Sequence, residues 1–144
     1  MASSTPHPAF NFQVEAGFSR IGFARVLLPA LEREVIRYRD GSDRVETVRL
    51  IPGQLRVGVC VLERGVVPPD NELFQWLNTI GGGKAERRDV VVKLLDPSHA
   101  PIMTWKLRNA FPSALQWSML DAQNSAVLIE TLRLAVESVD VEAS

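Results

Sequence analysis

Few residues in this 144-residue sequence have the types and spacing that chemistry requires. Residues 81–84 (Gly-Gly-Gly-Lys) resemble part of a phosphate-binding loop, whose backbone N–H groups cradle phosphate oxygens. Such a loop needs a Ser or Thr after the lysine, a strand before it and a helix after it. Here Ala85 follows the lysine, and the apolar pattern places a helix before the glycines. We therefore interpret the glycines as the turn that ends this helix.

Nucleophilic and metal-binding residues are equally sparse. Asp96, Ser98 and His99 have the residue types of a catalytic triad, but they fall within one predicted turn instead of converging from separate elements. Cys60 is the single cysteine, which excludes an internal disulfide and a multi-cysteine zinc site, and we expect it to be a small buried hydrophobic residue. His7 lies in a Pro-rich N-terminal arm, so the two histidines offer no spaced pair of metal ligands. The sequence thus predicts no catalytic residue, no metal site and no cofactor, and we expect a protein that is not an enzyme.

Composition indicates an ordinary folded protein. A hydrophobic fraction of 46% with 23% charged residues is typical of a globular domain. The net charge of −1 provides no bulk field that would recruit nucleic acid or an anionic membrane. No apolar run approaches the roughly 20 residues that span a bilayer, and the N-terminus has no secretory signal pattern. We expect one domain over residues 1–144, with residues 1–8 as a flexible arm, synthesised in the cytoplasm.

Short alternating segments separated by turns predict a mainly-β fold, a barrel or sandwich of about eight strands. Residues 9–15 and 21–27 both alternate, and we expect them to pair as a hairpin. Residues 54–63 have the clearest strand pattern, with alternate apolar residues on one face. Residues 42–53, just before them, are polar and Arg-rich, which predicts an extended loop or a projecting hairpin.

One segment, residues 70–80, changes period. Its apolar residues fall at i, i+3, i+4 and i+7, which is one stripe of an α-helix. Asp70 has the position of an N-cap, where its carboxylate would accept early backbone N–H groups. We expect the stripe to pack this single helix onto the strands as its core contact, through Leu73, Trp76, Leu77 and Ile80.

Several segments in order resemble one known family. The segments are EVIRYRDG at residues 34–41, IPG at 51–53, VLERG at 61–65, DNELFQW at 70–76, RRDVVVKLL at 87–95, MTWKLRNAFP at 103–112 and AVLIETLRL at 126–134. Together they are similar to the tube proteins of contractile phage tails and extracellular contractile injection systems, and to the type VI secretion tube protein. The resemblance covers nearly the whole chain.

This resemblance implies a structural protein with a β-barrel and one helix. Its members form hexameric rings that stack into a hollow tube inside a contractile sheath. The implied partners are further copies of the chain, the sheath protein, baseplate or hub proteins, tube-terminator proteins and a possible cargo protein in the lumen. No specific nucleic-acid sequence and no membrane insertion are expected. The mature location would be a phage tail or a released extracellular particle.

The expected assembly interface lies in and beside the polar segment 42–53, which one ring could lay on the next. Its candidate residues are Tyr38, Arg39, Asp43, Arg44, Glu46 and Arg49. Departures from the family pattern at residues 28–31 and 125–128 leave open a tube-initiator or adaptor paralogue near the baseplate. A more remote alternative is a small-molecule-binding β-barrel, which would have an apolar pocket and be a stable monomer.

Overall fold

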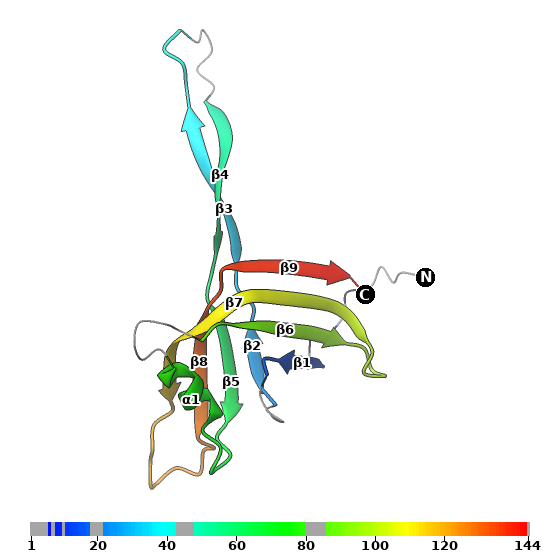
Figure 1. The fold of residues 1–144 in the computed structure, drawn as a ribbon, viewed down its shortest axis with the longest axis vertical. Coiled ribbons are helices and arrows are strands. Elements are labelled where there is room, and N and C mark those ends of the chain that lie inside the picture. Colours follow the sequence, from blue (N-terminus) through cyan, green and yellow to red (C-terminus); the bar gives the residue numbers. More distant parts are fainter. Residues whose placement is uncertain are drawn as a thin grey trace.

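A computed structural model describes residues 6, 8–9, 11–17, 22–42, 48–79 and 86–143 of the chain. These ranges contain nine strands and one short helix, which confirms the mainly-β prediction (Figure 1). None of the helical structure within these ranges is long and apolar enough to cross a membrane. The elements are β1 (Phe12–Glu15), β2 (Arg25–Leu27), β3 (Leu31–Tyr38), β4 (Arg49–Val57), β5 (Cys60–Gly65), α1 (Glu72–Asn78), β6 (Arg88–Leu95), β7 (Pro101–Trp117), β8 (Ile129–Ala135) and β9 (Ser138–Ala143).

The 17-residue strand β7 organises the main sheet. Its first half pairs with β6 on one edge and with β9 on the other, whereas its second half pairs with β8. One group of strands therefore has the order β1-β6-β7-β9, and the other has the order β7-β8-β5-β2, with every pair antiparallel. The two groups share β7 and form an open, sandwich-like fold instead of a closed barrel (Figure 1).

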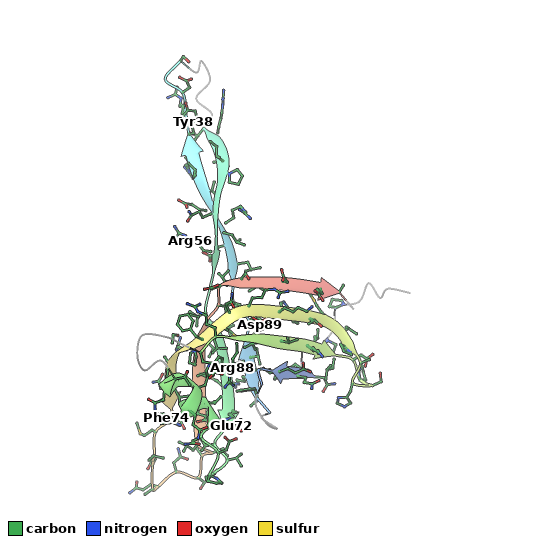
Figure 2. All side chains as sticks on the ribbon, in the orientation of Figure 1. Tyr38, Arg56, Glu72, Phe74, Arg88 and Asp89 are labelled. Carbon is green, nitrogen blue, oxygen red and sulfur yellow. The ribbon has the colours of Figure 1, made fainter. Side chains whose placement is uncertain are left out.

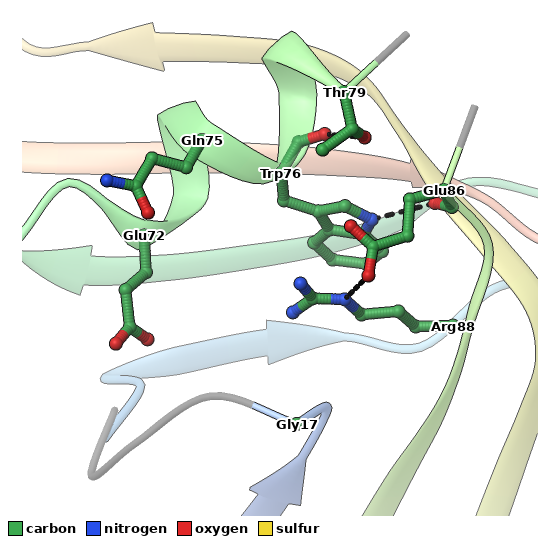
Figure 3. A pocket seen from close by; sticks show the side chains of 7 residues that line it. All are labelled: Gly17, Glu72, Gln75, Trp76, Thr79, Glu86 and Arg88. Atoms are coloured by element: carbon green, nitrogen blue, oxygen red, sulfur yellow. Dashed lines mark hydrogen bonds and ion pairs between the residues drawn. The ribbon is translucent and has the colours of Figure 1, made fainter. Parts of the chain in front are cut away.

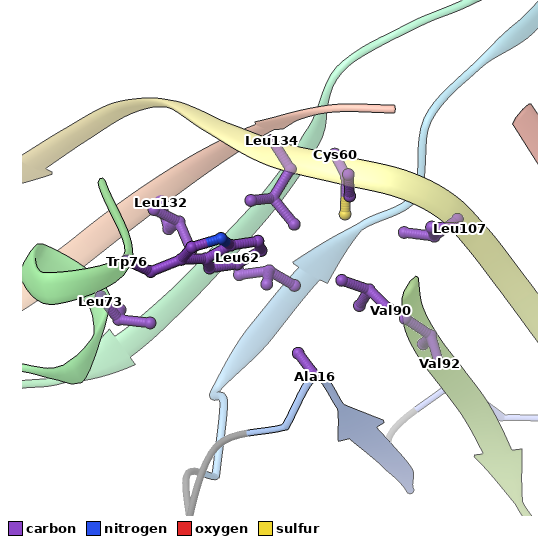
Figure 4. Packing of buried hydrophobic residues seen from close by; sticks show 11 residues of the cluster. Ala16, Cys60, Leu62, Leu73, Trp76, Val90, Val92, Leu107, Leu132 and Leu134 are labelled. Carbon is purple, nitrogen blue, oxygen red and sulfur yellow. The ribbon is translucent and has the colours of Figure 1, made fainter. Parts of the chain in front are cut away.

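The core lies between these two groups of strands (Figure 4). Since successive side chains of a strand point to opposite faces, each strand contributes alternate residues. The helix closes one end of the core with its buried face. The buried side chains include Cys60 and Leu62 from β5, Leu132 and Leu134 from β8, Val90 and Val92 from β6, Leu107 from β7, and Leu73 and Trp76 from α1.

Two expectations about strands were wrong. The hairpin of residues 9–15 and 21–27 does not form, because β1 pairs with β6 and β2 pairs with β5. The single strand over residues 54–63 is in fact two strands, β4 and β5, which belong to different sheets. The break occurs at Gly58, whose N–H donates to the Ala30 carbonyl at 2.8 Å. A Cβ at Gly58 would lie 3.1 Å from the Ala30 nitrogen, so the two chain segments cross there at a distance that suits glycine.

The buried thiol of Cys60 gives a first testable prediction. Burial raises the pKa of this thiol from 9.0 to about 12, so its thiolate is roughly a thousandfold rarer at pH 8 than that of an exposed cysteine. We expect a thiol reagent at pH 8 to leave Cys60 unmodified in the native protein and to label it fully in denaturant. A Val67→Cys variant places a thiol at a position 64% exposed and should react at once. Native Cys60 reacting as fast as that surface thiol would contradict the buried position.

Candidate assembly surface

Strands β3 and β4 form a separate two-stranded antiparallel hairpin that projects from the main sheet along the long axis of the molecule (Figure 1). Pairing runs from Leu31 opposite Val57 at the base to Tyr38 opposite Arg49 near the outer end. No other described strand pairs with either of them. An isolated two-stranded hairpin is at best marginally stable in water. This hairpin therefore has the properties of an element that a partner completes.

The hairpin exposes an unusual number of large apolar side chains. All eight residues of β3 are exposed, and β4 is exposed along most of its length (Figure 2). Exposed apolar patches of this kind mark interaction surfaces, since monomeric soluble proteins rarely carry them. The large hydrophobic residues that are 43–65% exposed between positions 31 and 57 are Leu31, Val35, Ile36, Tyr38, Val48, Leu50, Ile51 and Leu55.

The two faces of the hairpin differ in charge. Val35 lies opposite Pro52 and Arg37 opposite Leu50, and alternate residues of a strand share a face, so these side chains lie on the same face. A register shift in the pairing lies between Arg33 and Val35, and Arg33 is opposite Leu55. We call this surface the basic face and define it by Arg33, Val35, Arg37, Leu50, Pro52 and Leu55. It contains arginine and apolar side chains without a carboxylate. The opposite face carries Glu34, which lies 3.9 Å from Arg56 of β4.

The predicted interface residues fall on this hairpin in part. Tyr38 ends β3, Arg39 follows it, and Arg49 begins β4 directly opposite Tyr38. Asp43, Arg44 and Glu46 lie outside the described residues. The projection is also longer than the predicted segment, residues 42–53. Residues 49–53 belong to β4, and the whole projection spans residues 31–57. Sequence reasoning did not single out the apolar residues of either strand other than Tyr38, because it based the interface on the polar residues of the segment 42–53.

At the other end of the molecule, helix α1 is held by its buried face. Leu73 and Trp76 are buried, Leu77 is half-buried, and Ile80 lies outside the described residues. The Trp76 indole Nε1 donates to the Glu86 carbonyl at 2.9 Å. The Arg88 guanidinium lies 4.9 Å from the centre of the Trp76 ring (Figure 3). The indole is thereby fixed through its apolar surface, its N–H and its ring face.

A hollow of about 370 Å³ opens beside this tryptophan (Figure 3). Its charged residues include Glu86 and Arg88, which pair with each other at 3.3 Å. Within the described ranges, no group of three His, Cys, Asp or Glu side chains could hold a metal ion. The contacts of Trp76 with Glu86 and Arg88 anchor the helix beside this hollow. The lining residues are Gly17, Glu72, Gln75, Trp76, Thr79, Glu86 and Arg88.

A buried ion network joins the start of the helix to the main sheet. Arg64 and Glu130 are both only 4% exposed, and their side chains meet at 2.5 Å between Nε and Oε1. Arg64 also reaches Asp70 at 3.1 Å, and the Trp117 indole donates to Glu130 at 3.1 Å. Burial acts to lower the pKa of Arg64, but its hydrogen bonds to Asp70 and Glu130 outweigh burial and raise that pKa. The network connects β5, β7 and β8 with Asp70, which lies two residues before the first residue of the helix.

The helix begins slightly later than expected. Asn71, and not Asp70, occupies the N-cap position, and the helix covers Glu72–Asn78 instead of residues 70–80. Asp70 still accepts the Glu72 backbone N–H at 3.0 Å. This backbone hydrogen bond, together with Arg64, holds the pKa of Asp70 below its ordinary value.

Asp70 therefore makes a pH-dependent contribution to stability. Because its folded pKa is below its unfolded value near 3.9, its stabilising effect is complete above about pH 4 and is lost as the pH falls through the folded pKa. We expect Asp70→Asn to lower the free energy of unfolding by about 1 kcal/mol at pH 7, since the hydrogen bonds lose their charged acceptor. The difference between wild type and variant should be smaller at pH 3 than at pH 7 in urea unfolding. An equal difference at both pH values would contradict this assignment.

Comparison with known proteins finds a match over most of the chain. The family model described as the T4-like virus tail tube protein gp19 matches residues 8–140. Among curated proteins, sequence comparison finds no match.

Solved structures are similar over nearly their full length. A chain in the cryo-EM structure of the sheath–tube complex of an extracellular contractile injection system, PVC, is 30% identical, with a TM-score of 0.88. That alignment covers 98% of this chain and 94% of the other. A chain in the tube-terminating cap of the anti-feeding prophage, AFP, is 25% identical over 100% of this chain and 95% of that chain, with a TM-score of 0.89. Hcp1 from Flavobacterium johnsoniae shares the fold at 19% identity over 92% and 95% of the two chains, with a TM-score of 0.56.

Proposed function

The chain belongs to the T4-like virus tail tube protein family, and we propose that it is a ring-forming subunit of the inner tube of a contractile injection system or phage tail. In this proposal six copies close into a ring, and the rings stack into a hollow tube inside a sheath. The observation that carries it is the projecting hairpin of β3 and β4, whose large apolar side chains are exposed in the isolated chain. A neighbouring copy would cover them, as assembly requires.

The partners follow from the same proposal. The similar structures are described as a sheath–tube complex, a tube-terminating cap and a baseplate. We infer that this chain contacts further copies of itself, a sheath protein, and terminator and baseplate or hub proteins at the two ends of the tube. A cargo protein would occupy the lumen. The subunit would be made in the cytoplasm and end in a phage tail or a released extracellular particle.

Within the hairpin, the proposed interface residues are those at its outer end. Tyr38 and Arg49 lie opposite each other there, and Arg39 follows directly. Charged residues in such a contact fix register more than they add affinity. The proposed set also includes Asp43, Arg44 and Glu46.

Native mass spectrometry at micromolar concentration tests ring formation. The proposal expects hexamers, or stacks whose masses are multiples of six subunits. A small-molecule-binding β-barrel would instead be a stable monomer. A clean monomer at all concentrations and salt conditions, also with sheath and baseplate proteins present, would contradict the proposal.

A second candidate is a tube-initiator or adaptor subunit that forms one ring near the baseplate. It is supported by a 28% identical chain in the AFP baseplate structure, with a TM-score of 0.83 over 98% of both chains. Labelling the chain in its parent particle separates the two roles. A bulk tube subunit would be labelled along the whole tube, and an adaptor would be labelled at one end.

A further inference from the structure

A β-bulge lies in the middle of the projecting hairpin. The pairing of β3 with β4 shifts at one place, between Arg33 and Val35. Arg33 lies opposite Leu55, whereas Val35 lies opposite Pro52. Glu34 is therefore a single β3 residue that faces two residues of β4, so β4 carries one residue more than regular pairing needs. Such a bulge bends the strand that carries it and increases the local twist.

Crowding at the bulge requires a glycine. The two β4 residues opposite Glu34 are Gly53 and Gln54. A Cβ at Gly53 would lie 3.1 Å from the Glu34 Cβ and 3.2 Å from the Glu34 carbonyl oxygen, so a side chain there would force the neighbouring strand to shift. The Arg33 guanidinium donates to the Gly53 carbonyl at 3.0 Å and gives this oxygen a hydrogen-bond partner within the bulge. The bulge is thus specified by the residues around it.

The sequence at this place has the residue types that bulges use. Pro52 has no N–H to donate to a strand ladder, and proline within sheets is confined to edge strands, strand starts and bulges. Pro52 and Gly53 belong to the segment IPG, residues 51–53, which contributed to the family resemblance without a structural role. The bulge supplies a physical reason for these residues.

The hairpin is strongly twisted along its length. In Figure 1, β3 lies to the right of β4 near the base and to the left of β4 in the outer half. The bulge lies between these halves, with residues 31–33 paired on the side of the base and residues 35–38 paired on the outer side. No other described strand pairs with β3 or β4, so the direction of the outer half depends on the geometry of these two strands.

We propose that the bulge at Gly53 is a positioning element, which sets the direction in which the outer half of the hairpin leaves the main sheet. The inference rests on the proposed function, because this direction matters only when the hairpin has to meet a partner. All eight residues of β3 are exposed, so the outer half does not contribute to the core of the subunit. A change in its direction should therefore leave folding intact and impair assembly.

Deleting Gly53 tests the direction itself. The deletion removes the extra residue of β4 and should restore regular pairing with β3. Spin labels at Leu50→Cys and Val141→Cys report the distance between the outer half and the main sheet, since these positions are 65% and 46% exposed. Buried Cys60 should stay unlabelled. In the dispersed subunit, we expect the deletion to move the distance peak by more than the width of the wild-type peak.

Electron microscopy and thermal unfolding of unlabelled protein measure assembly and folding. After the deletion, residues 52 and 55 still share a face, so the hairpin keeps its exposed side chains and changes only their direction. We expect unchanged melting and a fall in the number of tubes by a factor of about ten or more, because a misdirected surface loses apolar burial. Gly53→Val keeps the chain length but crowds Glu34, and it should have the same effects.

Gln54→Ala is the matched control. It changes the other β4 residue of the bulge, which is exposed, and keeps both the chain length and the glycine. Its label distance, melting and number of tubes should equal those of wild type.

The outcomes separate the inference from the proposed function. A shifted label distance, unchanged melting and loss of tubes in the two Gly53 variants would support the inference. An unchanged distance in the deletion variant, wild-type tube numbers despite a shifted distance, or loss of tubes in Gln54→Ala at an unchanged distance would overturn it. If one Gly53 variant fails to fold, the other decides, and failure of both would overturn the inference because the bulge would then be a folding element. Wild-type protein that forms no rings would overturn the proposed function, while the label distance still tests the bulge in the dispersed subunit.

Discussion

Trp76→Ala is expected to lower the free energy of unfolding by about 3–5 kcal/mol, the range for truncating a buried large aromatic side chain. Trp76 is 1% exposed and packs with Leu73 in the core of the fold. The substitution also removes the indole donor to the Glu86 carbonyl and the ring under Arg88. A domain of this size has a total stability of only about 5–15 kcal/mol. We therefore expect a large fraction of the variant to unfold or aggregate.

Urea unfolding followed by circular dichroism measures this loss. Phe74→Ala is the control on the same helix, because Phe74 is 46% exposed and its truncation should change stability by no more than about 0.5 kcal/mol. Trp76→Phe keeps most of the apolar volume but loses the indole N–H, so its stability should lie between wild type and Trp76→Ala. Wild-type stability of Trp76→Ala would show that this face of the helix does not pack on the core.

Lysines on the basic face of the hairpin are expected to abolish tube formation and leave the subunit folded. Val35 and Leu50 are 59% and 65% exposed, so Val35→Lys/Leu50→Lys should change subunit stability by only about 0.5 kcal/mol per site. In an assembled tube these side chains would be buried, and each would contribute about 1.5–3 kcal/mol. Lysine replaces that gain with the cost of desolvating an ammonium group. It also adds positive charge beside Arg33 and Arg37.

Sedimentation and electron microscopy read out assembly, and thermal unfolding of the dispersed subunit reads out folding. The control is Val35→Ile/Leu50→Met, which keeps the same positions apolar and should form tubes. If the lysine variant forms as many tubes as wild type, the basic face is not buried in the assembly. If the lysine variant fails to fold while the control folds, the hairpin contributes to the core of the subunit, which would contradict its exposed position.

The sequence predicted the kinds of elements better than their partners. Leu73, Trp76 and Leu77 recur with a helical period, and the helix is present, two residues shorter at each end than expected. Alternation correctly indicated strands near β1 and β2. It identifies which face of a strand is apolar but carries no information on the neighbouring strand, and the expected pairing of these two strands was wrong. β9 was missed although Val139 and Val141 alternate with polar residues.

The hairpin shows a second limit of the sequence pattern. The turn residues located the projection, but the sequence pattern did not identify apolar residues such as Ile36, Leu50 and Ile51 as part of its exposed surface. The structure leaves them 43–65% exposed. An apolar residue that is buried against another copy has the same sequence pattern as one that is buried within its own chain. Only the position of β3 and β4 outside the main sheet distinguishes the two cases.

The family resemblance, in contrast, is confirmed, because the tail tube family model spans residues 8–140. The resemblance depends on the order of many short segments over the whole chain. It can therefore be recognised without predicting which strands pair with each other.

The most direct test of the account is electron microscopy of the purified chain and of its parent particle. The account predicts sixfold rings with a central channel that stack along one axis, and the same rings inside the sheath of the particle. In a reconstruction, the hairpin of β3 and β4 should lie against subunits of a neighbouring ring, with its apolar side chains covered. Tubes in which the hairpin points into solvent, or a particle whose tube consists entirely of another protein, would contradict it.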